Sequence, residues 1–351
     1  ILFGSDGLGL AESTALAHAC ADLLQQTNHV GRAKNGLIGV WPNGNTQGAF
    51  ELGFAPIADL ETALRTAPAV LIAGADPAGD DPVFARALEN GAFLAVQELF
   101  MTETAKLADV VFPALPNTEH EGTYTSGERR VQRFYDALPP LKEAKADFTI
   151  AAEIGKRLGL DLEGRSPALV LKQIGLKFSA FAGLTFQSLA EVYEQWPLVG
   201  RQDVYYGGTT YDNHQGLGVH LQSTAINGAV ELPRPPAVTR LEMKMGGILL
   251  FPVTRLYDRG SLMTQNALLK DRLADHTIEI HPETARRLRL SEKEPVEVSI
   301  NGIDYTVVVH ISLDVPEDMA LLPRSVGVPL NRSVAVIPTK LVQLLETQER
   351  G

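Results

Sequence analysis

The sequence is poor in cysteine, with Cys20 the only one in 351 residues. A single thiol excludes an intrachain disulfide framework, a CxxC zinc site and an iron–sulphur cluster held by this chain alone. Positive charge is also scarce, since 31 Lys and Arg face 42 Asp and Glu, for a net charge of −11. That balance argues against a nucleic-acid-binding protein and gives no attraction to anionic lipid.

Long hydrophobic runs are absent as well. The longest, Met245 to Val253, contains two glycines and a proline, whereas a membrane-spanning helix needs about 20 apolar residues. The opening ILFGSDGLGL has no basic flank and no cleavage pattern, so we expect no secretion signal and no membrane insertion. What is present, 45% hydrophobic and 21% charged residues, is typical of a globular chain of about two domains.

The first part of the chain alternates short apolar runs with helical patterns. This alternation predicts a doubly wound parallel sheet of the α/β class over residues 1–157. The expected strands are Ile1–Ser5, Ala69–Ala73, Phe93–Val96 and Val110–Phe112. The expected helices are Ala11–Gln26, Ile57–Ala67, Pro82–Glu89, Thr102–Ala108 and Asp147–Leu158.

Residues 158–245 form a mixed connecting segment that ends in a proline-rich linker at Pro233, Pro235 and Pro236. Residues 246–351 change to mostly β character, which predicts a small barrel. The Asn301-Gly302 pair between two alternating runs predicts a hairpin with a type I′ turn. The expected strands are Ile248–Val253, Thr277–Ile280, Pro295–Ile300, Tyr305–Val309, Met319–Leu322 and Val334–Ile337.

Three features are candidates for chemistry. The glycine turn Gly4–Gly9 lies between a strand and a helix, where amides can hold phosphate, but it lacks the G-x-G-x-x-G spacing. Asp76 follows a strand, where it can bind a ligand or cap the next helix. The basic cluster from Glu128 to Arg133 can bind a partner's carboxylate or anchor its own loop. No catalytic set and no metal-binding cluster is apparent.

Several motifs in order resemble the molybdopterin oxidoreductase family. The segment Asn28–Gly53 resembles the family's N-x-G-R and N-x-Q-G-A loop, and the β-rich C-terminus resembles its dinucleotide-binding domain. The other matching motifs are Gly74–Pro77, Thr102–Ala105, Ala108–Ala114, Glu119–Thr123, Glu128–Gln132 and Glu143–Phe148. The resemblance implies a six-stranded double-psi-type barrel at the C-terminus.

Within that family, GLIGVWPNGNTQGA and NTEHEGTYTSGERRVQRF are most similar to the large iron–sulphur subunits of respiratory NADH–quinone oxidoreductase. This resemblance implies a non-catalytic scaffold in the peripheral arm, on the cytoplasmic face of the inner membrane. Its partners would be the other arm subunits, with iron–sulphur clusters upstream or in those partners and no cofactor in this segment. The alternative is the C-terminal part of a formate dehydrogenase-like molybdenum or tungsten enzyme that binds molybdopterin guanine dinucleotide.

Under that alternative, Asp76, Thr264 and Asn331 are expected to line a cofactor cleft between the two domains. One position departs from the family pattern, because Gln265 stands where an arginine is usual. The loss of a guanidinium that can bind a pyrophosphate weakens cofactor binding.

Overall fold

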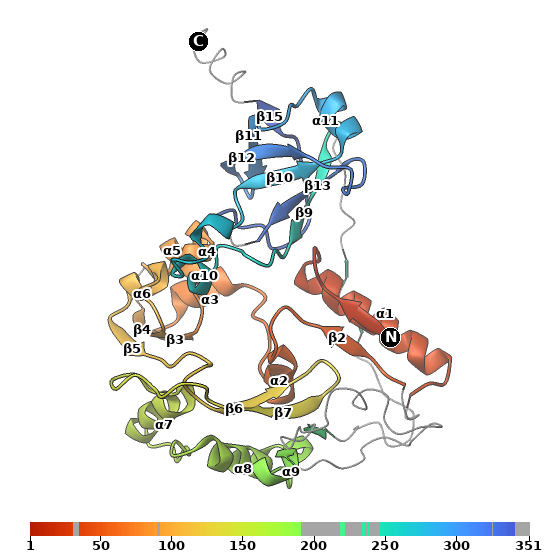
Figure 1. The fold of residues 1–351 in the computed structure, drawn as a ribbon. Coiled ribbons are helices and arrows are strands. Elements are labelled where there is room, and N and C mark those ends of the chain that lie inside the picture. The colour runs from red at the N-terminus through yellow and green to blue at the C-terminus, as the bar shows by residue number, and fades with distance from the viewer. Residues whose placement is uncertain are drawn as a thin grey trace.

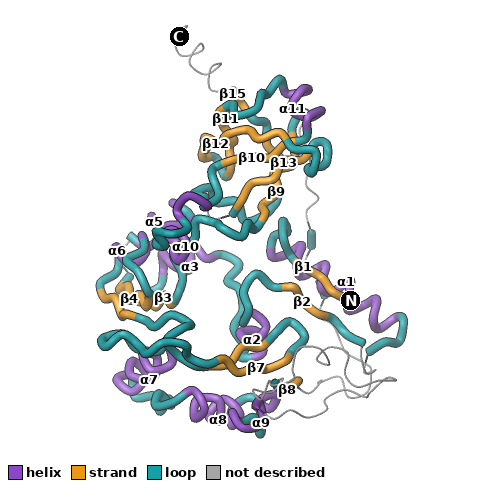
Figure 2. The backbone as a smooth tube through the Cα atoms, in the orientation of Figure 1, coloured by secondary structure: helices purple, strands orange, loops and turns teal. Residues whose placement is uncertain are grey.

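The structure is a computed structural model that describes residues 1–30, 35–89, 92–190, 218–221, 234–235, 237–238, 246–324 and 326–340. Figure 1 shows a β-rich C-terminal region, in blue, above the N-terminal α/β elements. Loops connect most of the strands and helices, as the tube in Figure 2 shows. No helix among the described residues is long and apolar enough to cross a membrane.

The N-terminus forms a small strand–helix–strand unit. Strand β1 (Leu2–Gly4) pairs in parallel with β2 (Ile38–Val40), and α1 (Leu10–Gln26) connects them. Helix α2 (Thr46–Glu51) follows. The Trp41 ring packs edge to face with Phe3 of β1 and with Phe50 of α2, so aromatic contacts link the strands to this helix.

A second parallel sheet has the strand order β3-β4-β5, with residues Ala69–Ala73, Phe93–Glu98 and Val110–Pro113. Four helices accompany it: α3 (Leu60–Thr66), α4 (Pro77–Asp80), α5 (Pro82–Leu88) and α6 (Glu103–Leu107). Ile72, Leu94 and Val96 alternate onto one face and pack against buried side chains from α3, α5 and α6. That packing gives the sheet its core.

The opposite face of this sheet is exposed except at its carboxyl end, where Gln97 is buried and donates a hydrogen bond to Asp147 of α7 (Asp147–Arg157). Leu71, Phe93 and Val110 are 50%, 53% and 36% exposed. Parallel sheets are normally covered on both faces. The predicted α/β class is observed, but among the described residues the strands form two separate sheets, each without a second helical layer, and not one doubly wound sheet.

A third unit surrounds an antiparallel hairpin. Strand β6 (Gly122–Thr125) pairs with β7 (Arg130–Phe134), which also pairs with β8 (Val219–His220). The helices of this unit are α7 (Asp147–Arg157), α8 (Pro167–Lys177), the 3-10 helix η1 (Ser179–Phe181) and α9 (Phe186–Ala190). Val131, Leu171 and Phe181 form part of its small core. Pro233 and Pro236 of the predicted linker lie outside the described residues.

The C-terminal region is a curled sheet of seven strands in the order β14-β9-β13-β10-β12-β11-β15. Strands β14 and β11 lie near opposite ends of this order and still contact each other, so the sheet curls toward closure. The strands are β9 (Ile248–Val253), β10 (Thr277–Ile280), β11 (Pro295–Ile300), β12 (Ile303–Ile311), β13 (Met319–Pro323), β14 (Val334–Val336) and β15 (Thr339–Lys340). Its helices are α10 (Ser261–Thr264), η2 (Lys270–Arg272) and α11 (Pro282–Leu288).

All six predicted C-terminal strands are present, but the predicted six-stranded double-psi barrel is not confirmed. The additional strand is β15, whose two residues return to pair with β11. The Asn301-Gly302 turn has positive φ at both residues, 51° and 80°, as a type I′ turn requires. The interior is continuous and apolar, and it includes fully buried Ile248, Leu250 and Ile278.

Candidate functional site

Asp76 lies where strand β3 ends, at the carboxyl edge of the β3–β4–β5 sheet. Its Oδ1 accepts hydrogen bonds from Thr104 N at 2.8 Å, Thr104 Oγ1 at 2.7 Å and Gly79 N at 3.3 Å. Asp76 therefore caps α4 and links it to α6, which confirms the capping interpretation. Ligands of open parallel sheets bind at this edge, so a structural role does not remove Asp76 from the candidate site.

Glu98 is a candidate that the sequence analysis missed. It ends the central strand β4, on the same face as Leu94 and Val96 by strand alternation, and it is only 7% exposed. Its Oε1 accepts a hydrogen bond from Leu99 N at 2.7 Å, and no ion pair joins it to a described Lys or Arg. A buried carboxylate without a cation is costly. The available signal was an acid two residues after the predicted strand Phe93–Val96.

Two groups near this edge have shifted pKa values. Desolvation raises the pKa of Asp80, although this residue is exposed, and the carboxylates of Asp76, Asp258 and Asp81 raise that pKa further. Burial also raises the pKa of Tyr305, as does Asp81, while Arg86 opposes the shift. Asp258 and Tyr305 belong to the C-terminal region, so charged groups of the two regions influence one another's pKa values near this edge.

Thr264 and Asn331, the other two predicted cleft residues, lie in separate parts of the C-terminal region. Thr264 ends α10, is exposed, and donates from Oγ1 to Gly260 O at 3.2 Å. Asn331 is exposed beside Arg332 and Ser333, which approach the N-terminal glycine turn. The cofactor cleft that Asp76, Thr264 and Asn331 would line stays a prediction.

The glycine turn contacts protein and not an open cleft. The backbone carbonyl of Gly7 accepts hydrogen bonds from Ser333 N at 2.9 Å and Ser333 Oγ at 2.8 Å. Arg324 reaches Asp6 at 3.3 Å. These contacts favour the tight-turn interpretation of Gly4–Gly9 over a phosphate site.

The basic cluster anchors its own surroundings. Arg129 binds both carboxylate oxygens of Glu51, at 2.6 and 3.0 Å. Arg130 is 3% exposed and pairs with Glu128 at 2.8 Å. Arg133 pairs with Glu121 at 2.7 Å. Of the two interpretations left open by the sequence, the internal anchor is the one that the structure supports.

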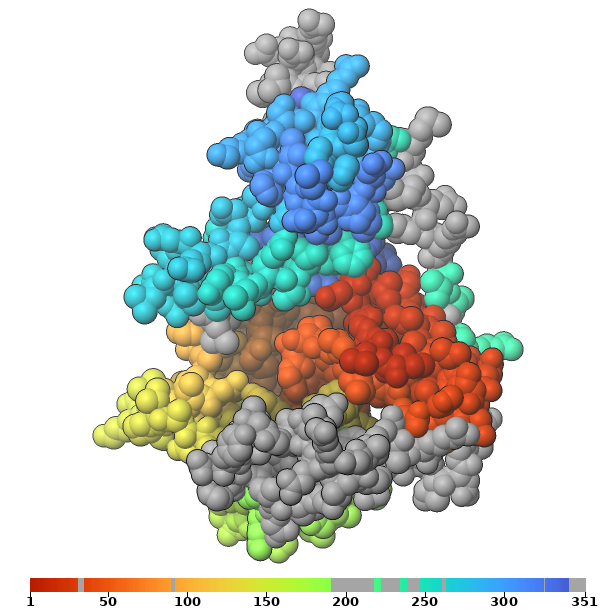
Figure 3. Space-filling view, turned by 45° about the vertical axis from the view of Figure 1, so that its right-hand side comes forward, coloured from red at the N-terminus to blue at the C-terminus, as the bar shows by residue number. Residues whose placement is uncertain are grey.

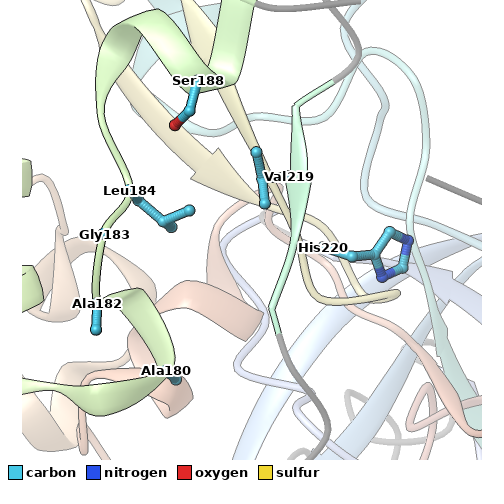
Figure 4. A pocket seen from close by; sticks show the side chains of 7 residues that line it. All are labelled: Ala180, Ala182, Gly183, Leu184, Ser188, Val219 and His220. Carbon is cyan, nitrogen blue, oxygen red and sulfur yellow. The ribbon is translucent and has the colours of Figure 1, made fainter. Parts of the chain in front are cut away.

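A separate small pocket of about 240 Å³ lies beside α9 and β8. Its lining is mostly small and apolar, and in Figure 4 the His220 ring points away from Ser188 and Leu184. Burial lowers the pKa of His220, as does nearby Arg130. The polar groups do not converge, so this pocket is not a candidate active site. Among the described residues, no group of three or more His, Cys, Asp or Glu could hold a metal.

Comparison with known proteins finds a family match for the N-terminal part of the chain. Residues 1–157 match the family of molybdopterin oxidoreductases, described as "Molybdopterin oxidoreductase". This match supports the family resemblance that the motifs indicated, over the α/β part of the chain.

Two similar proteins are both named "Putative formate dehydrogenase". The one from Staphylococcus aureus strain bovine RF122 is 29% identical over 231 residues, and the one from strain USA300 is 28% identical over the same length. The alignment covers 64% of this chain and only 22% of each relative. The chain thus spans about a fifth of the length of these relatives.

A solved structure, "Acetylene Hydratase from Pelobacter acetylenicus", shares the fold with a TM-score of 0.54 at 20% identity. The similarity covers 75% of this chain and 38% of that chain. This similarity concerns the fold alone.

Proposed function

We propose that this chain is the C-terminal part of a formate dehydrogenase-like molybdenum or tungsten oxidoreductase, and that it binds part of a molybdopterin guanine dinucleotide. The family match and the Staphylococcus aureus relatives support this role better than the respiratory scaffold. Formate as substrate comes from the names of those relatives and is part of the proposal. When bound, the cofactor supplies a redox-active metal centre.

The observation that carries the cofactor part of the proposal is Glu98. A buried carboxylate with no cation beside it fits a ligand that brings N–H donors, and both pterin and guanine present an amino group next to a ring N–H. A carboxylate accepts such a pair in a two-pronged arrangement, as it does from arginine. In this role Glu98 orients the cofactor, and Asp76 holds the neighbouring α4 and α6 in position.

The test is to purify the natural full-length protein with its partners and to measure Mo, W, Fe and the guanine nucleotide released by acid. We expect Mo or W in a stoichiometric amount together with GMP. Glu98→Gln should lower the bound nucleotide and the metal together. Glu103→Gln removes an exposed carboxylate of α6 and should leave both unchanged.

One residue favours the respiratory scaffold as a second candidate. Gln265 cannot supply the guanidinium that the resemblance leads us to expect at its position, so it weakens a cofactor site. Under that role the partners are the peripheral-arm subunits and the clusters lie outside this segment. Abundant Fe, with neither Mo nor W and no released pterin, would contradict the dehydrogenase proposal and favour the scaffold.

A further inference from the structure

Helix α4 has little apolar contact of its own. It is four residues long and none of them is buried, although Ala78 packs partly against the core of the sheet. Helix α6 is held more firmly, because Ala105 is buried in that core and Thr102 Oγ1 caps the helix by accepting a hydrogen bond from Ala105 N at 3.2 Å. Polar contacts with α6 therefore have a large share in fixing the position of α4.

Thr104 of α6 makes these polar contacts. It is fully buried, and its hydroxyl accepts a hydrogen bond from Ala78 N at 2.9 Å while it donates one to Asp76 Oδ1 at 2.7 Å. The backbone N of Thr104 donates to the same Asp76 oxygen at 2.8 Å. Because a hydroxyl can donate and accept at once, one side chain binds both the backbone of α4 and the carboxylate that caps this helix.

The same contacts orient the Asp76 carboxylate. Its described hydrogen bonds, from Thr104 and from Gly79 N, all reach Oδ1, and no described residue donates to Oδ2. Oδ2 lies against Gly79, where a Cβ would overlap with it. The glycine lets the carboxylate keep this orientation, so Oδ2 stays available to a hydrogen-bond donor that is not part of the described protein.

Asp76 follows a strand whose neighbour ends at Glu98. Gly74 N donates to Gln97 O at 2.9 Å, so the turn that leads from β3 to Asp76 lies directly beside the end of β4. Gly74 has φ +59°, and no described atom lies within 4 Å of the place of a Cβ on it, so the edge is open at this turn. In Figure 3 the orange part of the chain, which contains α4, lies directly below the cyan residues of the C-terminal region.

We propose that Thr104 is a positioning residue of the cofactor site, which fixes α4 and Asp76 so that Oδ2 accepts a hydrogen bond from a hydroxyl or amino group of the bound nucleotide. This inference rests on the proposed function, because it takes the ligand at this edge to be the guanine dinucleotide. Thr104 is fully buried and acts through Asp76. Without its hydroxyl, Ala78 N loses its acceptor and the carboxylate loses a donor, so both become less well placed.

The test measures how fast the natural full-length protein, purified with its partners, loses its cofactor on dialysis. The readout is the GMP that acid releases from the protein that remains. Thr104→Val keeps the shape of the side chain and removes the hydroxyl. It should lose the cofactor about tenfold faster than the wild type, because a hydrogen bond to a charged group is removed. Thr104→Ser retains a hydroxyl and should restore the wild-type rate.

Thr284→Val is the matched control. Thr284 is also buried, and its hydroxyl accepts a hydrogen bond from Asp318 N at 2.8 Å in the C-terminal region. The control should lower the melting temperature about as much as Thr104→Val and leave the rate of cofactor loss unchanged. Equal rates in the two variants would overturn the positioning role alone. A wild-type protein that holds no guanine nucleotide would overturn the proposed function, and this inference with it.

Gly79→Ala keeps the test decisive if Thr104→Val does not fold. The added methyl group would overlap with Asp76 Oδ2 and displace the carboxylate while Thr104 stays intact, so faster cofactor loss is expected again. Gly36→Ala is the control, since no described atom lies within 4 Å of the place of its Cβ, and it should keep the wild-type rate. Wild-type retention of the cofactor in folded Gly79→Ala would overturn the role given to the orientation of Asp76.

Discussion

The C-terminal region and the N-terminal α/β elements are stabilised in different ways. The C-terminal sheet encloses one continuous apolar core, and many of its side chains are fully buried. The N-terminal elements have two smaller cores and leave Leu2, Leu71 and Phe93 at least half exposed. They are joined instead by polar links such as Arg129–Glu51 and Gln97–Asp147. A single chain can thus rely on burial in one region and on directed polar contacts in another.

The largest effect is expected from Arg130→Glu in the N-terminal elements. It replaces a buried cation by an anion beside Glu128 and should lower the free energy of unfolding by about 3–5 kcal/mol. Urea denaturation followed by circular dichroism measures this. If the variant kept its stability but lost association with a partner protein, the internal anchor would be wrong and the docking interpretation right.

Leu250→Ala should have the next largest effect, on the C-terminal region. Leu250 is fully buried, and leucine-to-alanine changes in a core cost about 2–5 kcal/mol through lost burial and the cavity left behind. The same denaturation experiment tests it. A loss of less than about 1 kcal/mol would mean that this core is loosely packed and that the contrast between the regions is smaller than the burial pattern indicates.

A smaller effect is expected where Glu51 binds Arg129. Burial raises the pKa of Glu51, but hydrogen bonds from Arg129 and Gln47 and the charge of Arg129 outweigh it and hold the pKa below its ordinary value of 4.5. A lowered pKa contributes stability that is present above pH 4.5 and lost as the pH falls through the folded-state pKa.

Glu51→Gln should therefore cost on the order of 1–3 kcal/mol at pH 7 and flatten the acid side of the stability profile. The comparison is Glu153→Gln, whose ion pair with Lys145 is exposed and should contribute less than about 1 kcal/mol. Equal losses of unfolding free energy in the two variants would show that the contact between Glu51 and Arg129 stabilises the protein no more than an exposed ion pair does.

Leu71→Ala should have the smallest effect. The side chain lies on the open face of the β3–β4–β5 sheet, and changes at exposed positions usually stay within about 0.5 kcal/mol. Thermal unfolding of the isolated chain checks this. A loss as large as that of Leu250→Ala would indicate that this face is covered in solution.

Structural features that depend on residues close together in the sequence could be predicted from it. Strand Ala69–Ala73 and the Asn301-Gly302 turn follow from local pattern and turn chemistry, and both are observed. Features set by distant residues were not predictable in the same way. The partner of Arg129 is 78 positions away, and strand β15 forms only because β11 offers it an edge. Asp76 was found by its place after a strand, whereas Glu98 became a candidate only once its burial was known.

The antiparallel pairing of β14 with β9 joins the two ends of the C-terminal sequence, with Val336 opposite Ile248. Such a contact closes a long loop, and folds dominated by distant contacts form slowly. During synthesis, β9 emerges from the ribosome early and stays unpaired on that edge until the last strands follow. This region therefore cannot complete its sheet before the residues of β14 have been synthesised, and its apolar strands are exposed to aggregation in the interval.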